Sequence, residues 1–409
     1  MGWLEKLFPP MSREKFARRM IREMSRAPGV GIATYNPDEF MLVFAPSQHW
    51  VFLHNAYNDY LVASLKERGN VIRGYAGVVY TMSSESAKQL SYTDAKPSLL
   101  PRVRERYYHE SIRLVSLRDS GKETHSFPTR DFADGLTVEL VRDLPDSVAI
   151  LGDKTLADWN VSFEDALVVA KENLWKLSNQ EFTRHPSGLY LSPWRDTHDA
   201  SRIFLHDLIW QLKVNGDHVA MIPNRNYLLV AGSDDTDALL VMIEIVELSL
   251  KENRPMTGTA YRLAGSQWIP FLPPVSSPAY LPMRMAATRS LVADHSEQKA
   301  MLEAICEKTG RDVFIASLMV IQRDDGSVWS WTSWVDGITD ALMPKADYVC
   351  FGQSDGEGKS ATVGWGKWED VVRVASNLLG TTEHYPARYH VVAFPKPEQL
   401  MEMKLLASV

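Results

Sequence analysis

The sequence predicts an α+β fold, in which units of helix and antiparallel hairpin repeat and form antiparallel or mixed sheets. Between residues 131 and 231, strand patterns come in pairs and helical patterns stand between the pairs. The regular strand–helix alternation of a doubly wound parallel sheet is missing, which favours α+β over α/β. Of the 409 residues, 45% are hydrophobic and 23% are charged. This is ordinary globular composition, and the length indicates two or three domains.

Charge, cysteine content and hydropathy narrow the class of protein. The net charge of −7 disfavours a nucleic-acid partner that is bound through overall charge. With only Cys306 and Cys350 present, a disulfide framework is excluded and a reducing, cytoplasmic location is expected. The most apolar stretch, 238–250, is short and contains two glutamates, so no membrane partner is expected.

Each element of the first 270 residues has a local signal. Residues 12–26 predict a basic amphipathic helix, because Phe16, Met20 and Met24 recur every four positions and arginines occupy other positions. Ser162, with Asp165 three residues later, is typical of a helix start. The other predicted elements are strands over 40–44, 50–53, 135–141 and 147–151, a helix over 56–67 ended by Gly69, helices over 201–212 and 237–251, and a hairpin of strands 218–222 and 227–231.

Several segments of this region carry a resemblance. DFADGLTVELVRDLPDSVAILGDKTLADW, SFEDALVVAKENL, HDASRIFLHDLI and PNRNYLLVAG resemble, in that order, the YtpQ-like bacterial proteins of unknown function, and SLLPRVRER is similar to that family's Pro-x-hydrophobic-Arg segment. The similarity covers about residues 30–272. It implies a soluble α+β fold in a bacterial cytoplasm and supplies no catalytic residue. The matched positions at which it directs attention are Arg102, Arg104, Asp199, Ser201 and Arg202.

Prolines divide the chain. We predict a YtpQ-like domain over 1–270, with a potential division near residue 130, a proline-rich linker over 271–283 that cannot sustain a helix, and a tryptophan-rich α+β domain over 284–409. In the last domain Asp324-Asp325-Gly326 is a hairpin signal. The elements expected there are a helix over 296–308, strands over 313–323, 328–335, 348–351 and 361–365, a helix over 368–379 and a strand over 388–394.

The segment from 185 to 207 is the first place to look for chemistry. His198, Asp199 and His206 could meet on one helical face as metal ligands, since imidazole and carboxylate suit zinc or manganese. The alternative is structural: Asp199 caps the helix, Arg202 pairs with a carboxylate, and the histidines face solvent. The usual four-residue spacing of paired histidines is absent, so we favour the structural interpretation.

Two further catalytic patterns compete with capping. Ser201 could be a nucleophile with His198 or His206 as base, but no Gly-x-Ser-x-Gly elbow surrounds it. An aspartate cluster stands at the junction before the helix over 237–251, where the helix dipole attracts negative charge without any metal. Capping is favoured for both the serine and the aspartates Asp234, Asp235 and Asp237.

Arginines and tryptophans are the better candidates for a binding surface. Arg102, Arg104 and Arg106 alternate, so on a strand they would share one face and could hold a phosphate or an acidic partner. The competing explanation is an exposed edge strand that charge protects from self-pairing. Trp329 and Trp331 also share a strand face, either as core or as an aromatic recognition surface. The candidate residues for binding a ligand or partner are these arginines and tryptophans together with Arg202: Arg102, Arg104, Arg106, Arg202, Trp329 and Trp331.

No phosphate loop, dinucleotide fingerprint, His-Glu-x-x-His or Cys-x-x-Cys motif occurs, and no metal or cofactor is expected. The sequence therefore favours a non-enzymatic cytoplasmic module that binds a protein partner, with a homo-oligomer compatible with it. The alternative function is a hydrolase or nuclease that uses a His/Asp site around residues 198–206.

Overall fold

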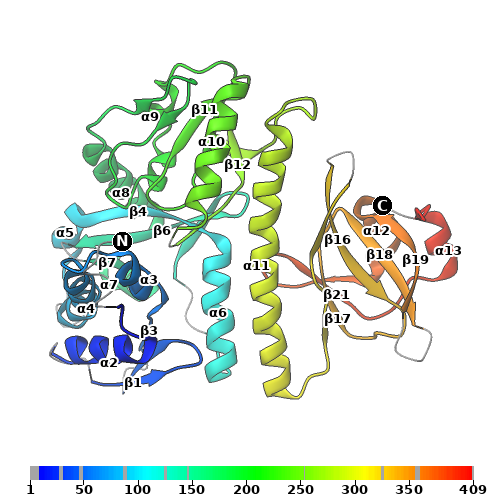
Figure 1. Cartoon of the computed structure of the whole chain (residues 1–409), viewed down its shortest axis with the longest axis horizontal. Coiled ribbons are helices and arrows are strands. Elements are labelled where there is room, and N and C mark those ends of the chain that lie inside the picture. Colours follow the sequence, from blue (N-terminus) through cyan, green and yellow to red (C-terminus); the bar gives the residue numbers. More distant parts are fainter. Residues whose placement is uncertain are drawn as a thin grey trace.

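The computed structural model has the α+β fold that the sequence predicts (Figure 1). Helices pack against antiparallel and mixed sheets in the described part of the chain. Every helix there is too short or too polar to span a bilayer. The described residues are 9–26, 31–45, 49–85, 90–123, 127–144, 147–252, 254–323, 327–354 and 360–407.

The N-terminal region packs helices on a small sheet. The predicted amphipathic helix is α2 (Arg13–Met24), which buries Phe16, Met20 and Met24. The prediction that Gly69 ends a helix is wrong, because Gly69 is the second residue of α4. Backbone N–H groups in this first turn have no intrahelical partner. The other elements are β1 (Ile32–Asn36), β2 (Met41–Ala45), β3 (His49–Phe52), α3 (His54–Val62) and α4 (Arg68–Glu85).

A second sheet has the order β4-β6-β5, with β7 paired to β6. The helix α6 leaves β4 without a loop, and α8 packs on β4. The predicted cap of α8 is confirmed, since Ser162 Oγ accepts a hydrogen bond from Asp165 N at 3.0 Å. The elements are α5 (Tyr92–Ala95), η1 (Lys96–Ser98), β4 (Leu99–Glu105), α6 (Arg106–Ser120), β5 (Thr129–Ala133), β6 (Leu136–Leu144), β7 (Ser147–Ile150), α7 (Asp153–Trp159) and α8 (Phe163–Leu177).

The third sheet has the order β13-β12-β10-β11-β9-β8. The predicted hairpin is confirmed as the antiparallel pair β10 and β11. The continuous helix expected over 201–212 is wrong: it divides into η2 and α9, because Leu205 leaves the helical region at φ −91°, ψ 74°. The elements are β8 (Thr183–Arg184), β9 (Tyr190–Leu191), η2 (Ala200–Phe204), α9 (His206–Trp210), β10 (His218–Met221), β11 (Leu229–Gly232), α10 (Thr236–Ser249), β12 (Ala260–Ala264) and β13 (Gln267–Phe271).

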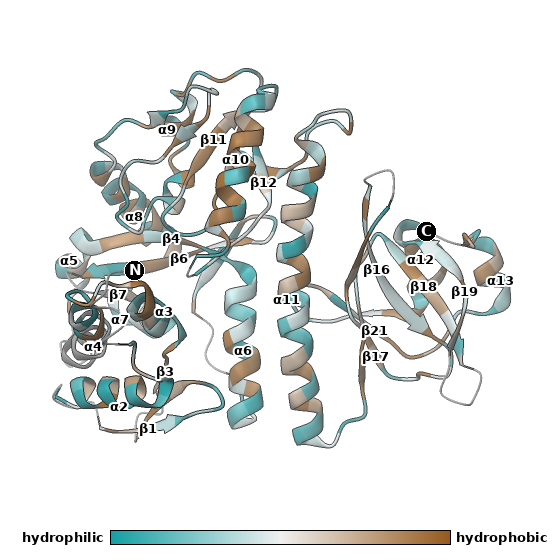
Figure 2. Ribbon diagram, viewed as in Figure 1, coloured by the Kyte–Doolittle hydropathy of each residue, from teal (hydrophilic) through white to brown (hydrophobic). Residues whose placement is uncertain are grey.

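One long helix, α11 (Tyr280–Thr309), stands between these sheets and the C-terminal region. Figure 1 shows it alongside α6 and α10, and Figure 2 shows that α10 is hydrophobic over most of its length where it packs between its sheet and α11. The expectation that 271–283 cannot sustain a helix is wrong, because α11 begins at Tyr280 with Pro282 in its first turn. Proline is tolerated there, since that N–H has no intrahelical acceptor.

The C-terminal region holds two four-stranded sheets, of order β14-β17-β21-β20 and β15-β16-β18-β19. The predicted hairpin turn 324–326 lies outside the described residues, but the flanking β15 and β16 pair antiparallel. The helix expected over 368–379 ends early, at Ala375. The elements are β14 (Phe314–Ile315), β15 (Met319–Gln322), β16 (Val328–Val335), β17 (Ala341–Pro344), β18 (Tyr348–Ser354), β19 (Ser360–Lys367), α12 (Trp368–Ala375), η3 (Ser376–Leu378), β20 (Leu379–Thr381), β21 (Arg388–Val391) and α13 (Pro397–Glu402).

A buried arginine ties α11 to this region. Arg388 is 1% exposed, and its guanidinium donates to Gln298 Oε1 at 2.5 Å and to the carbonyls of Ala316 and His295 at 2.7 and 3.0 Å. A buried charge is tolerated only where hydrogen bonds replace its hydration. The same packing encloses His295, so burial first, and then the nearby Arg388 charge, lowers the pKa of His295 to about 3.

His295 should make folding sensitive to acid. Its pKa is about 3 in the folded state against 6.5 as the reference, so the unfolded chain binds the proton first and stability falls as pH drops below 6.5. We expect His295→Gln to reduce the pH slope of the unfolding free energy by up to about 1.4 kcal/mol per pH unit in that window. Urea denaturation at a series of pH values measures the slope, with exposed His185→Gln as the control. Equal slopes in both variants would contradict the assignment.

Candidate functional site

The histidines and aspartate of the proposed metal site do not form one. His198 is 3% exposed, and its Nε2 lies 3.5 Å from Asp143 Oδ1. Its burial, which also lowers its pKa, contradicts the expectation that it faces solvent. His206 is only partly exposed and packs near the rings of Trp210 and Trp268. Among the described residues, no group of three or more His, Cys, Asp or Glu side chains is placed to hold a metal ion.

Asp199 does not cap a helix in the predicted way. Its side chain makes no cap hydrogen bond to η2, and its Oδ1 instead accepts from Arg195 N at 3.2 Å. The chain turns back sharply before η2, with Arg195 and Thr197 at φ 51° and 70°. This turn brings the Arg195 amide to the carboxylate, so Asp199 fixes the preceding loop rather than the following turn. Asp235 likewise begins α10 without a side-chain cap hydrogen bond.

The Ser201 hydroxyl accepts a hydrogen bond from a backbone N–H, and its buried position does not suit a nucleophile. The hydroxyl oxygen accepts a hydrogen bond from Val103 N at 3.2 Å, and the residue is 2% exposed. Val103 belongs to β4, which lies at the edge of its sheet and therefore has backbone groups without a strand partner. Next to Ser201, Ala200 N donates to Arg225 O at 3.2 Å. The η2 turn therefore joins β4 to the β10–β11 connection.

Arg202 pairs with a carboxylate, as predicted. It is fully buried and donates to both oxygens of Asp196, at 2.8 and 2.6 Å, and to Ser178 Oγ at 2.9 Å. Its guanidinium also lies 4.1 Å from the ring centroid of Trp194. All of these contacts are internal, so Arg202 has a structural role, and the prediction that it binds a partner finds no support in its placement.

Arg102 and Arg104 share one face of β4, as predicted, but they are not solvated. Their side chains are 13% and 12% exposed, and both approach Glu139 Oε1 on β6, with Arg104 Nε at 3.6 Å. Glu139 is fully buried and stands opposite Arg102 in the strand register. The alternative prediction, that these two arginines lie exposed on an edge strand and protect it from self-pairing, is therefore wrong. Arg106 is also misplaced by the strand prediction, because α6 begins there.

Two more arginines approach this face from loops. Arg225 lies in the β10–β11 connection and Arg254 in the α10–β12 connection, and a bridge between Asn224 and Pro255 holds the two loops side by side. Burial, and then the charges of Arg254, Arg104 and Arg102, lower the pKa of Arg225 to about 10. These four residues, Arg102, Arg104, Arg225 and Arg254, are called the arginine cluster below.

Positive charge exceeds negative charge in the arginine cluster. Among the described residues, Glu139 is the one carboxylate at ion-pair distance from any of its four guanidinium groups. Arg254 donates to Tyr75 Oη at 2.7 Å, and the Tyr75 hydroxyl donates to Asp59 at 2.5 Å. Arg254 is thus linked to the Asp59 carboxylate through the Tyr75 hydroxyl. Sequence reasoning missed Arg225 and Arg254, which carry no spacing signal relative to β4.

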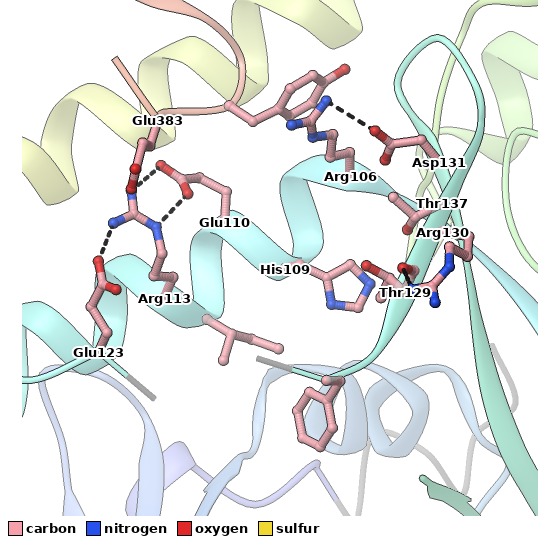
Figure 3. Close-up of a pocket in the computed structure, with 13 residues that line it drawn as sticks. Arg106, His109, Glu110, Arg113, Glu123, Thr129, Arg130, Asp131, Thr137 and Glu383 are labelled. Atoms are coloured by element: carbon pink, nitrogen blue, oxygen red, sulfur yellow. Dashed lines mark hydrogen bonds and ion pairs between the residues drawn. The ribbon is translucent and has the colours of Figure 1, made fainter. Parts of the chain in front are cut away.

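A cleft of about 620 Å³ opens beside the cluster, between α6, β5, β6 and the segment before β21 (Figure 3). His109 connects the two features, since it lines the cleft and its Nε2 lies 3.9 Å from Oε2 of Glu139, the carboxylate that pairs with the arginine cluster. Charges in the cleft are mostly paired: Arg113 binds Glu110 and Glu123, each at 2.8 Å, as Figure 3 shows. The cleft is therefore balanced in charge, whereas the arginine cluster is not.

The two candidate tryptophans are neither fully buried nor fully exposed. Trp329 packs edge-on against Tyr348 at 5.4 Å between ring centroids, and Trp331 against Trp365 at 5.2 Å. Trp334 and Trp368 are core residues, at 4% and 8% exposed. The structure thus divides the tryptophans between core and a half-exposed sheet face, and recognition through Trp329 and Trp331 stays a prediction.

Comparisons with protein-family models, with curated proteins and with solved structures gave no match to this chain. The resemblance to the YtpQ-like family therefore stays a prediction from the sequence, and the site rests on geometry alone.

Arg202 should be important for stability. Arg202→Ala removes a buried bidentate pair and leaves Asp196 without its counter-ion, so we expect a loss of about 3 kcal/mol in unfolding free energy. Arg195→Ala, an exposed arginine of the same loop, should change it by less than about 0.5 kcal/mol. Chemical denaturation monitored by tryptophan fluorescence measures both. Similar losses in the two variants would show that the Asp196 pair is not the cause.

Proposed function

We propose that this chain is a binding protein that recognises an anionic group, carboxylate or phosphate, on a protein partner, and that the arginine cluster is the recognition site. One observation carries the proposal: four guanidinium groups from three separate segments converge where the described residues supply one ion-paired carboxylate. Like charges at short range in a poorly solvated place repel one another. An incoming anion relieves this repulsion, which favours its binding.

Arginine suits this ligand. Its planar guanidinium binds carboxylate and phosphate oxygens through two parallel N–H donors, and it stays charged where lysine would lose its proton. Arg225 has no carboxylate partner among the described residues, which leaves its donors for a ligand. Arg102 is held by Glu139, so it orients the site, while Arg225 and Arg254 supply donors from the loops.

A protein partner is favoured over a nucleic acid. The chain carries a net charge of −7, which repels a polyanion outside the local cluster. The neighbouring cleft of about 620 Å³ has side chains of both signs together with Ile112, Phe127 and Tyr385. Such a lining accepts the mixed side chains that flank an acidic residue in a peptide. His198, Asp199 and Ser201 are held in internal contacts, which supports binding over the hydrolase or nuclease alternative.

Titration calorimetry with a glutamate-rich peptide, a phosphoserine peptide and inorganic phosphate tests the proposal. We expect peptide binding that weakens with salt, and a loss of about 10-fold or more in Arg225→Gln, the size of one charged hydrogen bond. The same variant should melt at an equal or higher temperature, because it removes a repelling charge. Loss of binding through misfolding would instead lower the melting temperature.

Arg195→Gln is the matched control, since Arg195 is exposed and lies outside the cluster. It should bind like the wild type. Three results would overturn the proposal: no binding of either peptide, equal affinities in Arg225→Gln and the wild type, or phosphate bound as tightly as the peptides. The last result would indicate a free small anion in place of a protein partner.

A further inference from the structure

A second cavity, of about 390 Å³, lies beside the β4–α6 corner, between the start of β6, the β12–β13 hairpin and α11. It differs from the arginine cluster in the sign of its charge. Glu105, Asp134 and Asp294 line it, and Tyr385 separates it from the cleft of Figure 3, because that residue lines both. The strand β4 therefore presents Arg104 to the cluster and Glu105, the next residue, to this cavity.

Glu105 is a buried acid with an unused oxygen. Its Oε2 is inaccessible to solvent and has no hydrogen-bond partner among the described residues. Glu105 stands at the N-cap of α6, yet its side chain makes no cap hydrogen bond. The usual structural use of a carboxylate at a helix start is thus absent, and Glu105 lines the cavity with Oε2 unpaired, although its own backbone N–H donates to the carboxyl group.

Asp294 approaches the same space from α11. Burial, followed by the charges of Glu105 and Glu297, raises the pKa of Asp294 to about 8. Burial also raises the pKa of Glu105 to about 7, although Arg104 and Arg102 oppose this and Glu139 adds to it. The two carboxyl groups thus repel each other when both are ionised, and a like-charged pair in a poorly solvated site calls for a counter-ion.

The cations nearby are engaged elsewhere. Arg104, whose charge acts on Glu105, lies on the other face of β4, where its Nε is 3.6 Å from Glu139 Oε1. Arg284 lines the cavity, but its guanidinium pairs with Asp347 at 2.6 Å. Arg106 lies 4.8 Å from the ring centroid of Tyr385 and 3.5 Å from Asp131. The described residues therefore provide no cation for Glu105 and Asp294 within the cavity itself.

The other walls are apolar or neutral. Tyr261 and Tyr385 contribute aromatic rings, and the Tyr261 hydroxyl donates to Asp134 O at 2.9 Å. Gly135 has φ 77°, and a Cβ there would lie 2.9 Å from Tyr385 Oη, so the backbone comes close to this ring. The apolar side chains of the lining are Met256, Phe271, Leu272 and Leu291.

We propose that this cavity binds an organic cation, an ammonium group carried on a short apolar or aromatic chain, with Glu105 and Asp294 as its counter-ions. Ammonium N–H donors satisfy the unused Glu105 oxygen, and the apolar wall and tyrosine rings receive the chain. A divalent metal is disfavoured because it requires more oxygen ligands, and no three-residue metal cluster occurs among the described residues. The site does not depend on the proposed anion-binding function, since its ligand has the opposite charge.

Calorimetric titration with 2-phenylethylammonium, and with neutral 2-phenylethanol, tests the site. At about pH 8.5 both carboxyl groups are ionised, so the ammonium should bind at least about 10-fold more tightly than the alcohol. At about pH 6 protons compete, and the ammonium affinity should fall by about 10-fold or more. Proton release on binding should be greater at about pH 6 than at about pH 8.5, as buffers with different ionisation enthalpies will show.

Glu105→Gln and Asp294→Asn should each abolish the preference for the ammonium, whereas Glu123→Gln, an exposed acid of the neighbouring cleft, should keep it. Both cavity variants should remain folded. A carboxyl group whose pKa is raised in the folded state destabilises the folded protein as the pH rises through that pKa. The Gln and Asn variants should therefore each melt at a higher temperature than the wild type at about pH 8.5. Equal affinities for the ammonium and the alcohol, no binding of either, or an unchanged preference in the two cavity variants would overturn the proposal. None of these results bears on peptide binding at Arg225.

Discussion

The hydrogen bond from Val103 N to Ser201 Oγ is the contact on which the arrangement of charges depends. β4 is an edge strand, and η2 covers part of that edge in place of another strand. Ala200, the residue before Ser201, donates a backbone hydrogen bond to the carbonyl oxygen of Arg225. One short turn therefore fixes the distance between the arginines of β4 and the arginine of the β10–β11 connection. The buried pair of Arg202 with Asp196 holds the turn itself in place.

Strand alternation at the β4–α6 corner separates charges of opposite sign. Arg102 and Arg104 point to the face where Glu139 lies, while Glu105 reaches the cavity beside α11. No loop lies between β4 and α6, since Glu105 ends the strand and Arg106 begins the helix. α11 completes the cavity by adding Asp294 to the lining that contains Glu105, and Arg388 anchors α11 to the C-terminal sheets. Residues far apart in the sequence thus meet at one corner.

The sequence predicted local elements well where a local signal existed. The α2 stripe of Phe16, Met20 and Met24, the Ser162 cap and the β10–β11 hairpin all appear as expected. Failures occurred where tertiary contacts outweigh propensity: Leu205 breaks a helical pattern, and Pro282 falls in the one turn of α11 that tolerates it. The sequence predicts a cap at Asp199 because capping is a common use of aspartate at a helix start, but in the structure the Arg195 N–H of the preceding loop is the competing donor.

What the sequence by itself determined is the α+β class, the helices and hairpins with clear periodicity, and the fact that Arg102 and Arg104 share one side of a strand. These follow from backbone geometry over a few residues, which the order of side chains encodes directly. Only the tertiary structure decided that Arg225 and Arg254 join them, that Glu139 lies beneath, and that Glu105 meets Asp294 across 189 positions of chain. Electrostatic effects depend on distance and burial in space, and neither can be read from separation along the chain.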